Sequence, residues 1–400
     1  MKEGWEIKPF SEICYSIEDG DWIEKKDQSD SGIRLVQTGN VGVGQYRDKS
    51  DKSKFISEET FKRLKCTEIV AGDVLISRLP DPVGRACILP PLKTKCITAV
   101  DCSILKLKPN EIVPSWFIYY TQSEAYFSSV RAECSGTTRD RITRKKLSII
   151  TIPIPSLYEQ QRIVDILDKE FEKIDRLKSN AELNLQNAKS LLGSIQTKLL
   201  LNKSWRKYSL ADVCSQITDG THRTPKYLPQ GIPFLSVKNI TGGFLDLENT
   251  RFISQEEHQE LIKRCNPEYG DILYTKVGTT GVARLINTHD EFSIFVSLAL
   301  LKVNQGIIKN SLLVYILNSP YVWEQAQKLT RGVANRNFVI SDIKKVEVYI
   351  PPISEQDKIE SEIERYLKQI SIFQDNYNKT LSLCDDLKQS LLRKAFNGEL

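Results

Sequence analysis

The sequence lacks the features of a membrane-spanning, secreted or disulfide-bonded protein. No run approaches the ~18 apolar residues that cross a bilayer, and the first ten residues, MKEGWEIKPF, contain no apolar signal-peptide core. The nine cysteines include no CxxC pair, which favours a reducing compartment. The three histidines, His222, His258 and His289, are scattered, so we expect no protein-built zinc site. These absences predict a cytoplasmic protein without a membrane partner or a resident metal.

Sequence motifs for catalysis are also missing. There is no GxxxxGK[ST] phosphate loop, no glycine-rich cofactor turn and no Asn-Pro-Pro-aromatic methyltransferase motif. The nearest catalytic grouping is EDGDWIEKK, in which Asp19, Asp21, Glu24 and Lys26 could hold magnesium and activate water. The missing motifs predict that this chain holds no cofactor. The acids of EDGDWIEKK leave a magnesium-dependent nuclease as the alternative.

The sequence does contain an internal duplication. At an offset of 200 residues, WEIKPFSEICYSIEDG from Trp5 aligns with WRKYSLADVCSQITDG from Trp205. Further matches follow in the same order, such as AGDVLISR with YGDILYTK and SLYEQQRI with PISEQDKI, and the offset drifts only to 196. Where the first copy reads EDGDWIEKK, the second reads TDGTHRTPK and keeps only Asp-Gly. This retention favours a tight turn over a metal site.

Each copy predicts a mixed α/β globular domain followed by a long helix. Strand-like runs such as DVLISR and DILYTK alternate with helical patches, and Gly, Pro and Asp separate them. The following segments carry apolar residues at alternating steps of four and three, beginning with Leu167, Phe171 and Ile174 in one copy and with Ile363, Leu367 and Ile370 in the other. Such seams predict two long helices that form an antiparallel coiled coil with a pseudo-twofold internal repeat. The alternative is that each helix packs on its own domain.

The domain boundaries follow from this pattern. Proline precedes each helical segment, and Ser156 and Ser354 are the expected N-caps. The predicted parts are 1–157 for the first globular domain, 158–201 for the central helix, 202–352 for the second globular domain and 353–400 for the C-terminal helix.

Positive charge is concentrated on the globular parts. The whole chain carries a net charge of +5. Because the central helix segment is neutral and the C-terminal one carries −2, the globular parts together carry +7. Basic side chains supply phosphate contacts to nucleic acids, and Arg and Asn can also read base edges. The cluster TTRDRITRKK and its counterpart TRGVANRN therefore supply the candidate DNA contacts Arg139, Arg141, Arg144, Lys145, Arg331, Asn335, Arg336 and Asn337.

Two further segments supply polar candidates. The VGTTG run could form a backbone nest that binds an anion, or an ordinary glycine turn. Further candidate DNA contacts lie in or beside this run, its first-copy counterpart RLPDPVG and the Asp-Gly turn. They are Arg78, His222, Arg223, Lys276, Thr279 and Thr280.

Several segments, in this order, resemble the specificity (S) subunit of type I restriction–modification systems over essentially the whole chain. They are LADVCSQITDGTHRTPKYLPQGIPFLSVKNI, GDILYTKVGTTGVA, IPPISEQDKI and the final LLRKAFNGEL. The first copy departs from this pattern, with EDGDWI in place of TDGTHRTP and RLPDPVG in place of KVGTTG.

The resemblance implies a subunit with no active site and with two target recognition domains. Each domain would read one half of a split site in double-stranded DNA, and the helices would set the spacing between the half-sites. Two adenine-methylating modification subunits and the restriction subunits would be the partners, and these would hold S-adenosylmethionine, ATP and Mg²⁺. The expected host is prokaryotic.

The duplicated helices also predict two similar surfaces for the modification subunits. The candidate contact residues are Glu159, Gln160, Glu355, Gln356, Ala395 and Phe396. A coiled-coil scaffold that never binds DNA is the other alternative.

Overall fold

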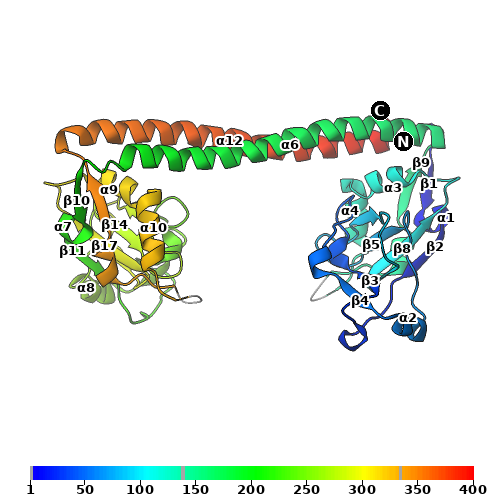
Figure 1. Ribbon diagram of the computed structural model, residues 1–400, viewed down its shortest axis with the longest axis horizontal. Coiled ribbons are helices and arrows are strands. Elements are labelled where there is room, and N and C mark those ends of the chain that lie inside the picture. The colour runs from blue at the N-terminus through cyan, green and yellow to red at the C-terminus, as the bar shows by residue number, and fades with distance from the viewer. Residues whose placement is uncertain (1–2, 137–139, 333–335) are drawn as a thin grey trace. The chain divides into compact units, whose positions relative to one another are not determined.

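The computed structural model describes residues 3–136, 140–332 and 336–400. Their contacts divide the chain into two compact units (Figure 1). Unit 1 consists of Met1–Ala181 and Lys379–Leu400, and unit 2 is Glu182–Asn378. Each unit therefore contains one globular domain and parts of both long helices.

Unit 1 is built on three sheets. A four-stranded sheet has the order β2-β8-β5-β6, a three-stranded sheet has the order β4-β3-β7, and β1 pairs with β9. The strands are β1 (Glu6–Pro9), β2 (Cys14–Asp19), β3 (Ile33–Val36), β4 (Lys54–Ile56), β5 (Val74–Ser77), β6 (Ala86–Ile88), β7 (Cys96–Thr98), β8 (Cys102–Leu107) and β9 (Thr151–Ile154). The helical elements are α1 (Phe10–Ile13), η1 (Lys25–Asp27), η2 (Thr38–Asn40), η3 (Ser50–Lys52), α2 (Glu58–Leu64), α3 (Pro114–Tyr120), α4 (Glu124–Glu133) and α5 (Arg144–Ser148).

Unit 2 repeats this topology. Its sheets have the orders β11-β17-β14-β15, β13-β12-β16 and β10-β18. The strands are β10 (Arg206–Ser209), β11 (Cys214–Asp219), β12 (Ile232–Leu235), β13 (Arg251–Ile253), β14 (Ile272–Thr275), β15 (Ala283–Leu285), β16 (Ser293–Ile294), β17 (Leu298–Val303) and β18 (Glu347–Ile350). The helical elements are α7 (Leu210–Val213), η4 (Val237–Asn239), α8 (Gln255–Ile262), α9 (Asn310–Leu317), α10 (Pro320–Leu329) and α11 (Ile340–Ile343). Irregular register recurs after Cys14 and after Cys214, which confirms the duplication in detail.

In each unit, the four-stranded sheet separates two apolar cores. Successive side chains of a strand point to opposite faces, so Val74 and Ile76 join the larger core of unit 1, while Leu75 joins the smaller one. In unit 2, Ile272 and Leu273 divide in the same way. The strand-like runs DVLISR and DILYTK thus form β5 and β14, which are fully buried inner strands of these sheets.

The long helices α6 (Leu157–Leu200) and α12 (Ile353–Asn397) pack together in antiparallel fashion. In unit 1, Lys178 pairs with Asp385 at 2.7 Å and Lys388 with Asp175 at 2.5 Å. In unit 2, Leu200 and Ile363 belong to one core. This confirms the predicted antiparallel pair, and the lysines that interrupt each seam reach acids on the opposite helix.

The helices also pack on their own globular domains. The alternative prediction, in which each helix buries its apolar seam on its own domain, is therefore correct in part. Ile163, Val164 and Leu167 of α6 are buried in the larger core of unit 1. Ser156 caps α6 by accepting from the backbone nitrogen of Glu159 at 3.3 Å. Ser354 lies inside α12 instead of capping it. Within the described ranges, we find no helix whose length and hydropathy would suit a bilayer span.

Candidate nucleic-acid interface

An Asp-Gly turn closes the first strand of each four-stranded sheet. The backbone nitrogen of Gly20 donates to Cys102 at 2.9 Å, and that of Gly220 donates to Leu298 at 3.2 Å. A side chain at either glycine would overlap the backbone oxygen of a neighbouring strand. The close packing explains why the glycine is kept in both copies, and it holds the preceding aspartate in place.

In unit 2, the buried turn aspartate is the centre of a charge cluster. The carboxylate of Asp219 accepts from Lys276 at 3.0 Å, lies 3.1 Å from Nε2 of His222 and pairs with Arg264. Lys276 is only 4% exposed. Because a buried ammonium needs a charged partner, the Lys276 side chain is held in the interior by Asp219.

Unit 1 pairs the matching aspartate with the matching cation at a longer distance, and a further cation lies near the same carboxylate. Asp19 lies 3.5 Å from Arg78 and 3.9 Å from Arg144. Arg78 is 4% exposed, and its guanidinium also donates to the carbonyl of Val100. Burial lowers the pKa of Arg78, yet the guanidinium stays charged near neutral pH.

The basic segment of unit 1 is anchored on this arginine. The backbones of Ser135 and Arg141 bond to each other in both directions, and the nitrogen of Ile142 donates to the carbonyl of Arg78 at 3.4 Å. The side chain of Arg141 pairs with Asp101 at 3.0 Å and is 46% exposed. Arg144 and Lys145 are exposed as well, whereas Arg139 lies outside the described residues. The described part of this segment can therefore present its cations to a phosphate backbone.

The matching segment of unit 2 is anchored on Lys276. The backbones of Arg331 and Asn337 bond to each other at 2.9 Å in both directions, and the nitrogen of Phe338 donates to the carbonyl of Lys276 at 2.7 Å. Arg331 is exposed and pairs with Asp342 at 2.7 Å. Asn335 lies outside the described residues.

The side chains of two other residues of this segment are partly buried. Arg336 donates to the side chain of Gln327. The Oδ1 atom of Asn337 is buried and, among the described residues, has no hydrogen-bond partner.

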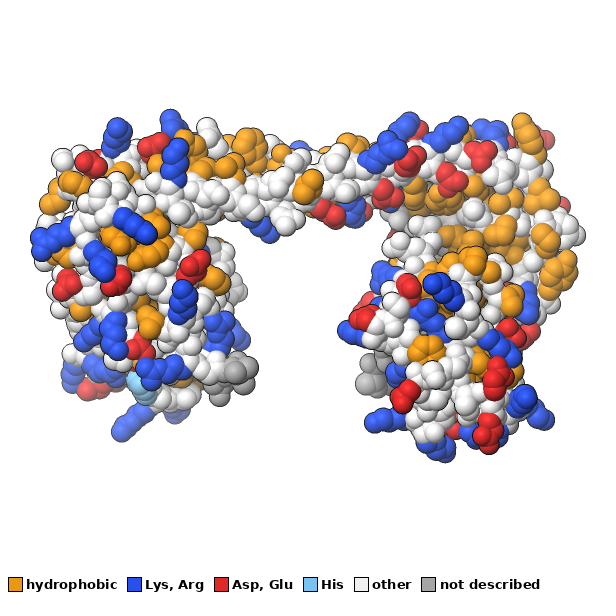
Figure 2. All heavy atoms as spheres, viewed as in Figure 1, with side chains coloured by type: hydrophobic (Ala, Val, Ile, Leu, Met, Phe, Trp, Pro, Cys, Tyr) orange, Lys and Arg blue, Asp and Glu red, His pale blue; other side chains and the backbone are white. Residues whose placement is uncertain are grey.

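The remaining polar candidates divide between surface and interior. His222, Arg223 and Thr279 are exposed. Thr280 is 2% exposed, and its hydroxyl bonds to that of Thr330 at 3.0 Å. Figure 2 shows blue Lys and Arg side chains, with some acidic ones among them, at the end of each globular part away from its helices. Exposed cations on an anchored backbone are suited to contacts with DNA.

The acids of EDGDWIEKK do not converge on a metal position. Asp21 accepts from the backbone nitrogen of Thr67 at 3.0 Å, and its burial raises the pKa of its carboxyl. Glu24 pairs with Lys26 at 2.7 Å. Over the described ranges, no group of three or more His, Cys, Asp or Glu side chains is placed to hold a metal ion. In the part of the chain that the structure describes, these acids therefore do not form the metal site that the nuclease alternative requires.

Most of the predicted partner contacts lie inside the fold. Gln160 is fully buried: its Oε1 accepts from Val113, and its Nε2 donates to Glu111 and Pro155. Gln356 makes the matching bonds to Lys309, Ile307 and Pro351. Both amides therefore fasten a helix start to its domain. Glu159 pairs with Arg162 at 2.7 Å, and Glu355 is exposed in the first turn of α12.

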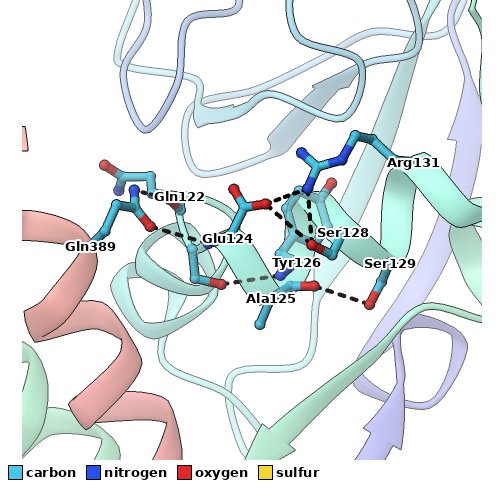
Figure 3. Close-up of polar contacts among 9 residues, drawn as sticks. Gln122, Glu124, Ala125, Tyr126, Ser128, Ser129, Arg131 and Gln389 are labelled. Atoms are coloured by element: carbon cyan, nitrogen blue, oxygen red, sulfur yellow. Dashed lines mark hydrogen bonds and ion pairs between the residues drawn. The ribbon is translucent and has the colours of Figure 1, made fainter. Parts of the chain in front are cut away.

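The C-terminal end of α12 belongs to the core of unit 1. Ala395 is fully buried, and the ring of Phe396 lies 4.5 Å from that of Trp116. Figure 3 shows Gln389 of α12 at the start of α4, where it accepts from the nitrogen of Glu124 at 3.1 Å and donates to the carbonyl of Gln122 at 3.0 Å. These contacts dock α12 onto the globular domain.

Exposed apolar side chains on the helices were not among the predicted contacts. Leu177 and Leu387 in unit 1 are 54% and 48% exposed, and Leu191 and Phe373 in unit 2 are each 50% exposed. The offset of 196 relates Leu177 to Phe373 and Leu191 to Leu387. Each residue lies three positions after a buried seam residue, and the Lys178–Asp385 pair puts Leu177 and Leu387 at one level. Each unit thus presents an equivalent apolar pair beside its seam.

Comparison with known proteins identifies this arrangement. The profile of the family described as type I restriction modification DNA specificity domain matches residues 2–185 and 202–381. The chain is 25% identical over 432 residues to the type I restriction enzyme EcoKI specificity subunit of Escherichia coli K12, covering 100% of this chain and 90% of that protein. It is 24% identical over 430 residues to the StySPI specificity subunit of Salmonella potsdam, covering 100% of this chain and 90% of that protein.

Two solved structures share the fold. A chain in the structure described as the basis of complex assembly and conformational transition of the type I R-M system aligns with a TM-score of 0.81 at 18% identity, covering 100% of this chain and 99% of that chain. The HsdS subunit from Thermoanaerobacter tengcongensis aligns with a TM-score of 0.59 at 18% identity, covering 100% of this chain and 98% of that chain.

Proposed function

Because the chain belongs to the family of type I restriction–modification DNA specificity subunits, which are non-catalytic and carry two target recognition domains, we propose that residues 1–157 and 202–352 each read one half of a bipartite site in double-stranded DNA. One observation carries this proposal. In both copies, a basic segment is anchored on a buried cation that faces the turn aspartate, while the exposed side chains of the two segments differ. A common scaffold with different exposed groups is what two readers of different sequences require.

The proposal gives the candidate residues two roles. Contacts to the first half-site come from Arg141, Arg144 and Lys145, and from Arg139. Contacts to the second come from Arg331 and Arg336, from Asn335, and from His222, Arg223 and Thr279. Arg78 and Lys276, both buried, hold the contact segments in position through their backbone carbonyls, and Thr280 and Asn337 face inward.

We further propose that two modification subunits bind the helices. The Leu177–Leu387 pair and the Phe373–Leu191 pair offer them equivalent surfaces, since apolar side chains exposed beside a helix seam can be buried by a partner helix. Glu159 and Glu355 flank the two helix starts and complete these surfaces. Restriction subunits join through this assembly. S-adenosylmethionine, ATP and Mg²⁺ are held by the partner subunits, and the complex works in the prokaryotic cytoplasm.

The helices themselves are proposed to fix the spacing between the half-sites. Their antiparallel pairing supports this role, because a heptad seam defines the register of the two helices. The spacing would then depend on helix length and not on the recognition domains.

Mapping of adenine methylation tests the two-reader proposal. The chain is co-expressed with its modification subunit, and the methylated motif is compared for Arg141→Ala, Arg331→Ala and the unaltered chain. We expect Arg141→Ala to weaken or relax only one half-site and Arg331→Ala only the other, by about 1–3 kcal/mol for a base contact. Lys106→Ala and Arg206→Ala, which remove exposed cations elsewhere on the two domains, serve as charge controls. If both test variants altered the same half-site, the proposal would be wrong.

A further inference from the structure

Trp22 is an exposed tryptophan in the segment that the nuclease reading singled out. Its side chain is 70% exposed, although burying an indole is strongly favourable. The indole nitrogen lies at the hydrogen-bonding limit of 3.5 Å from Oε1 of Glu24.

The backbone that carries Trp22 is tightly held. The nitrogen of Asp21 donates to Thr98 at 2.8 Å, and the nitrogen of Val100 donates to Asp21 at 2.9 Å. The carboxylate of Asp21 is occupied by the nitrogen of Thr67. Trp22 therefore projects from a rigid turn, and a contact through its side chain would lose little backbone entropy.

The turn lies next to the basic segment of unit 1. Asp101, which directly follows Val100, pairs with Arg141, and Asp19 lies 3.9 Å from Arg144. Trp22 thus emerges beside the same cations that the proposed function assigns to DNA.

His222 occupies the matching position in unit 2. It lies 200 residues after Trp22, and its side chain is 63% exposed. Thr221 pairs with Phe295 just as Asp21 pairs with Ala99. The duplication has kept the turn and its backbone pairing while the exposed side chain changed from indole to imidazole.

We propose that Trp22 and His222 are specificity-determining residues that contact base edges of duplex DNA. This inference rests on the proposed function. Trp22 makes an apolar contact in the first half-site, of the kind that recognises a thymine methyl group or opens a base step. When Nε2–H of His222 donates to Asp219, Nδ1 is left as an acceptor. It then fits the exocyclic amino group of adenine or cytosine in the second half-site.

The test measures binding of the complex with modification subunits to DNA libraries randomised in one half-site at a time. We expect Trp22→Ala to weaken binding to the preferred first half-site about tenfold, to relax preference at one or two positions, and to leave the second half-site unchanged. His222→Ala should do the converse. Tyr15→Ala is the matched control, because Tyr15 is a 69% exposed aromatic residue at the opposite end of β2.

A second measurement reports on Trp22 directly. The chain is labelled with 5-fluorotryptophan, and the ¹⁹F resonance that disappears in Trp22→Phe is assigned to Trp22. This resonance should shift when DNA with the preferred first half-site is added and should stay in place with DNA altered in that half-site.

The outcomes separate this inference from the proposed function. If Arg141→Ala changes the first half-site while Trp22→Ala behaves like Tyr15→Ala and the ¹⁹F resonance stays in place, the inference is overturned and the proposed function stands. If the unaltered complex shows no sequence preference, the proposed function fails first.

Discussion

The carboxylate of Asp219 lies 3.0 Å from the ammonium nitrogen of Lys276, and both side chains are buried. The backbone carbonyl of Lys276 also accepts from Phe338, at the end of the basic segment of unit 2. One ion pair thus connects the Asp-Gly turn with that segment. The Asp19–Arg78 pair makes the same connection in unit 1.

Removing the acid of this pair should destabilise unit 2 strongly. Asp219→Ala leaves the buried ammonium of Lys276 without its counter-charge, which costs about 3–5 kcal/mol. Denaturant unfolding of the full chain measures this loss. The double variant Asp219→Ala with Lys276→Met should recover most of it, because no buried charge then remains. A double variant as unstable as the single one would show that the ion pair is not the cause.

Truncation of Phe396 should destabilise unit 1. Its ring packs on Trp116 and Tyr120 at centroid distances of 4.5 and 5.1 Å, so Phe396→Ala leaves a cavity that costs about 3–5 kcal/mol. Leu387→Ala, at an exposed position of the same helix, should change the free energy of unfolding by less than about 0.5 kcal/mol. Equal losses in the two variants would contradict the burial of the helix end.

Charges placed in the apolar pairs should release one modification subunit at a time. Leu177→Glu with Leu387→Glu places carboxylates where unit 1 would meet its partner, and Phe373→Glu with Leu191→Glu does so in unit 2. Native mass spectrometry of the co-expressed proteins should show two copies on the unaltered chain, one on either double variant and none when all four changes are combined. Glu182→Gln on the exposed surface of α6 is the control. Retention of two copies by the fourfold variant would exclude these surfaces.

The stability of unit 2 should depend on pH through His258. This residue is 2% exposed, its Nδ1 lies 2.9 Å from Oγ of Ser293, and burial lowers its pKa below the ordinary value of 6.5. The folded state therefore keeps the imidazole neutral while the unfolded chain takes up a proton as the pH falls through about 6.5. Stability should be fully present above that pH and should decline below it.

Thermal unfolding between pH 5 and 8 checks this dependence. Unit 1 has Phe61 and Ile97 in the matching positions, both associated with one apolar cluster. The double variant His258→Phe with Ser293→Ile should therefore flatten the decline. An unchanged slope would assign the pH dependence to other groups.

Lengthening both helices should lengthen the spacing of the DNA site. Asn187 and Asn376 lie at one level of the antiparallel pair, by the register of the Lys178–Asp385 contact. Insertion of seven residues after each preserves the heptad seam and adds ~10.5 Å of helix, which corresponds to about three base pairs. Methylation mapping should show the same half-sites with a longer spacer. Altered half-site bases would refute the division of roles between domains and helices.

The architecture could be predicted from the sequence because the two copies of the duplication can be aligned with each other. The aligned segments predicted two equal domains, and the seam residues Leu167, Ile174 and Ile370 predicted the helix pair. Burial of individual polar residues was harder to predict. Gln160 and Gln356 looked like surface contacts because glutamine is usually exposed, yet their identity in both copies was the available sign of a shared structural role.

The end of α12 could not be placed from its local pattern. Ala395 and Phe396 continue the periodicity of an amphipathic helix, and this periodicity does not say which domain covers them. Their neighbours Trp116 and Tyr120 are more than 270 residues away in the sequence. Trp22 carries no such signal in the sequence, because the acids Asp19, Asp21 and Glu24 dominate its segment.

The division of the chain into units also has a consequence for its synthesis. Unit 2 is one continuous stretch, Glu182–Asn378, whereas unit 1 is completed by Lys379–Leu400. Since domains fold as units during translation, the second domain has all of its residues before the first does. The larger core of unit 1 lacks Leu392, Ala395 and Phe396 until the final turns of α12 have left the ribosome. The domain that is made first is therefore the last to complete its core.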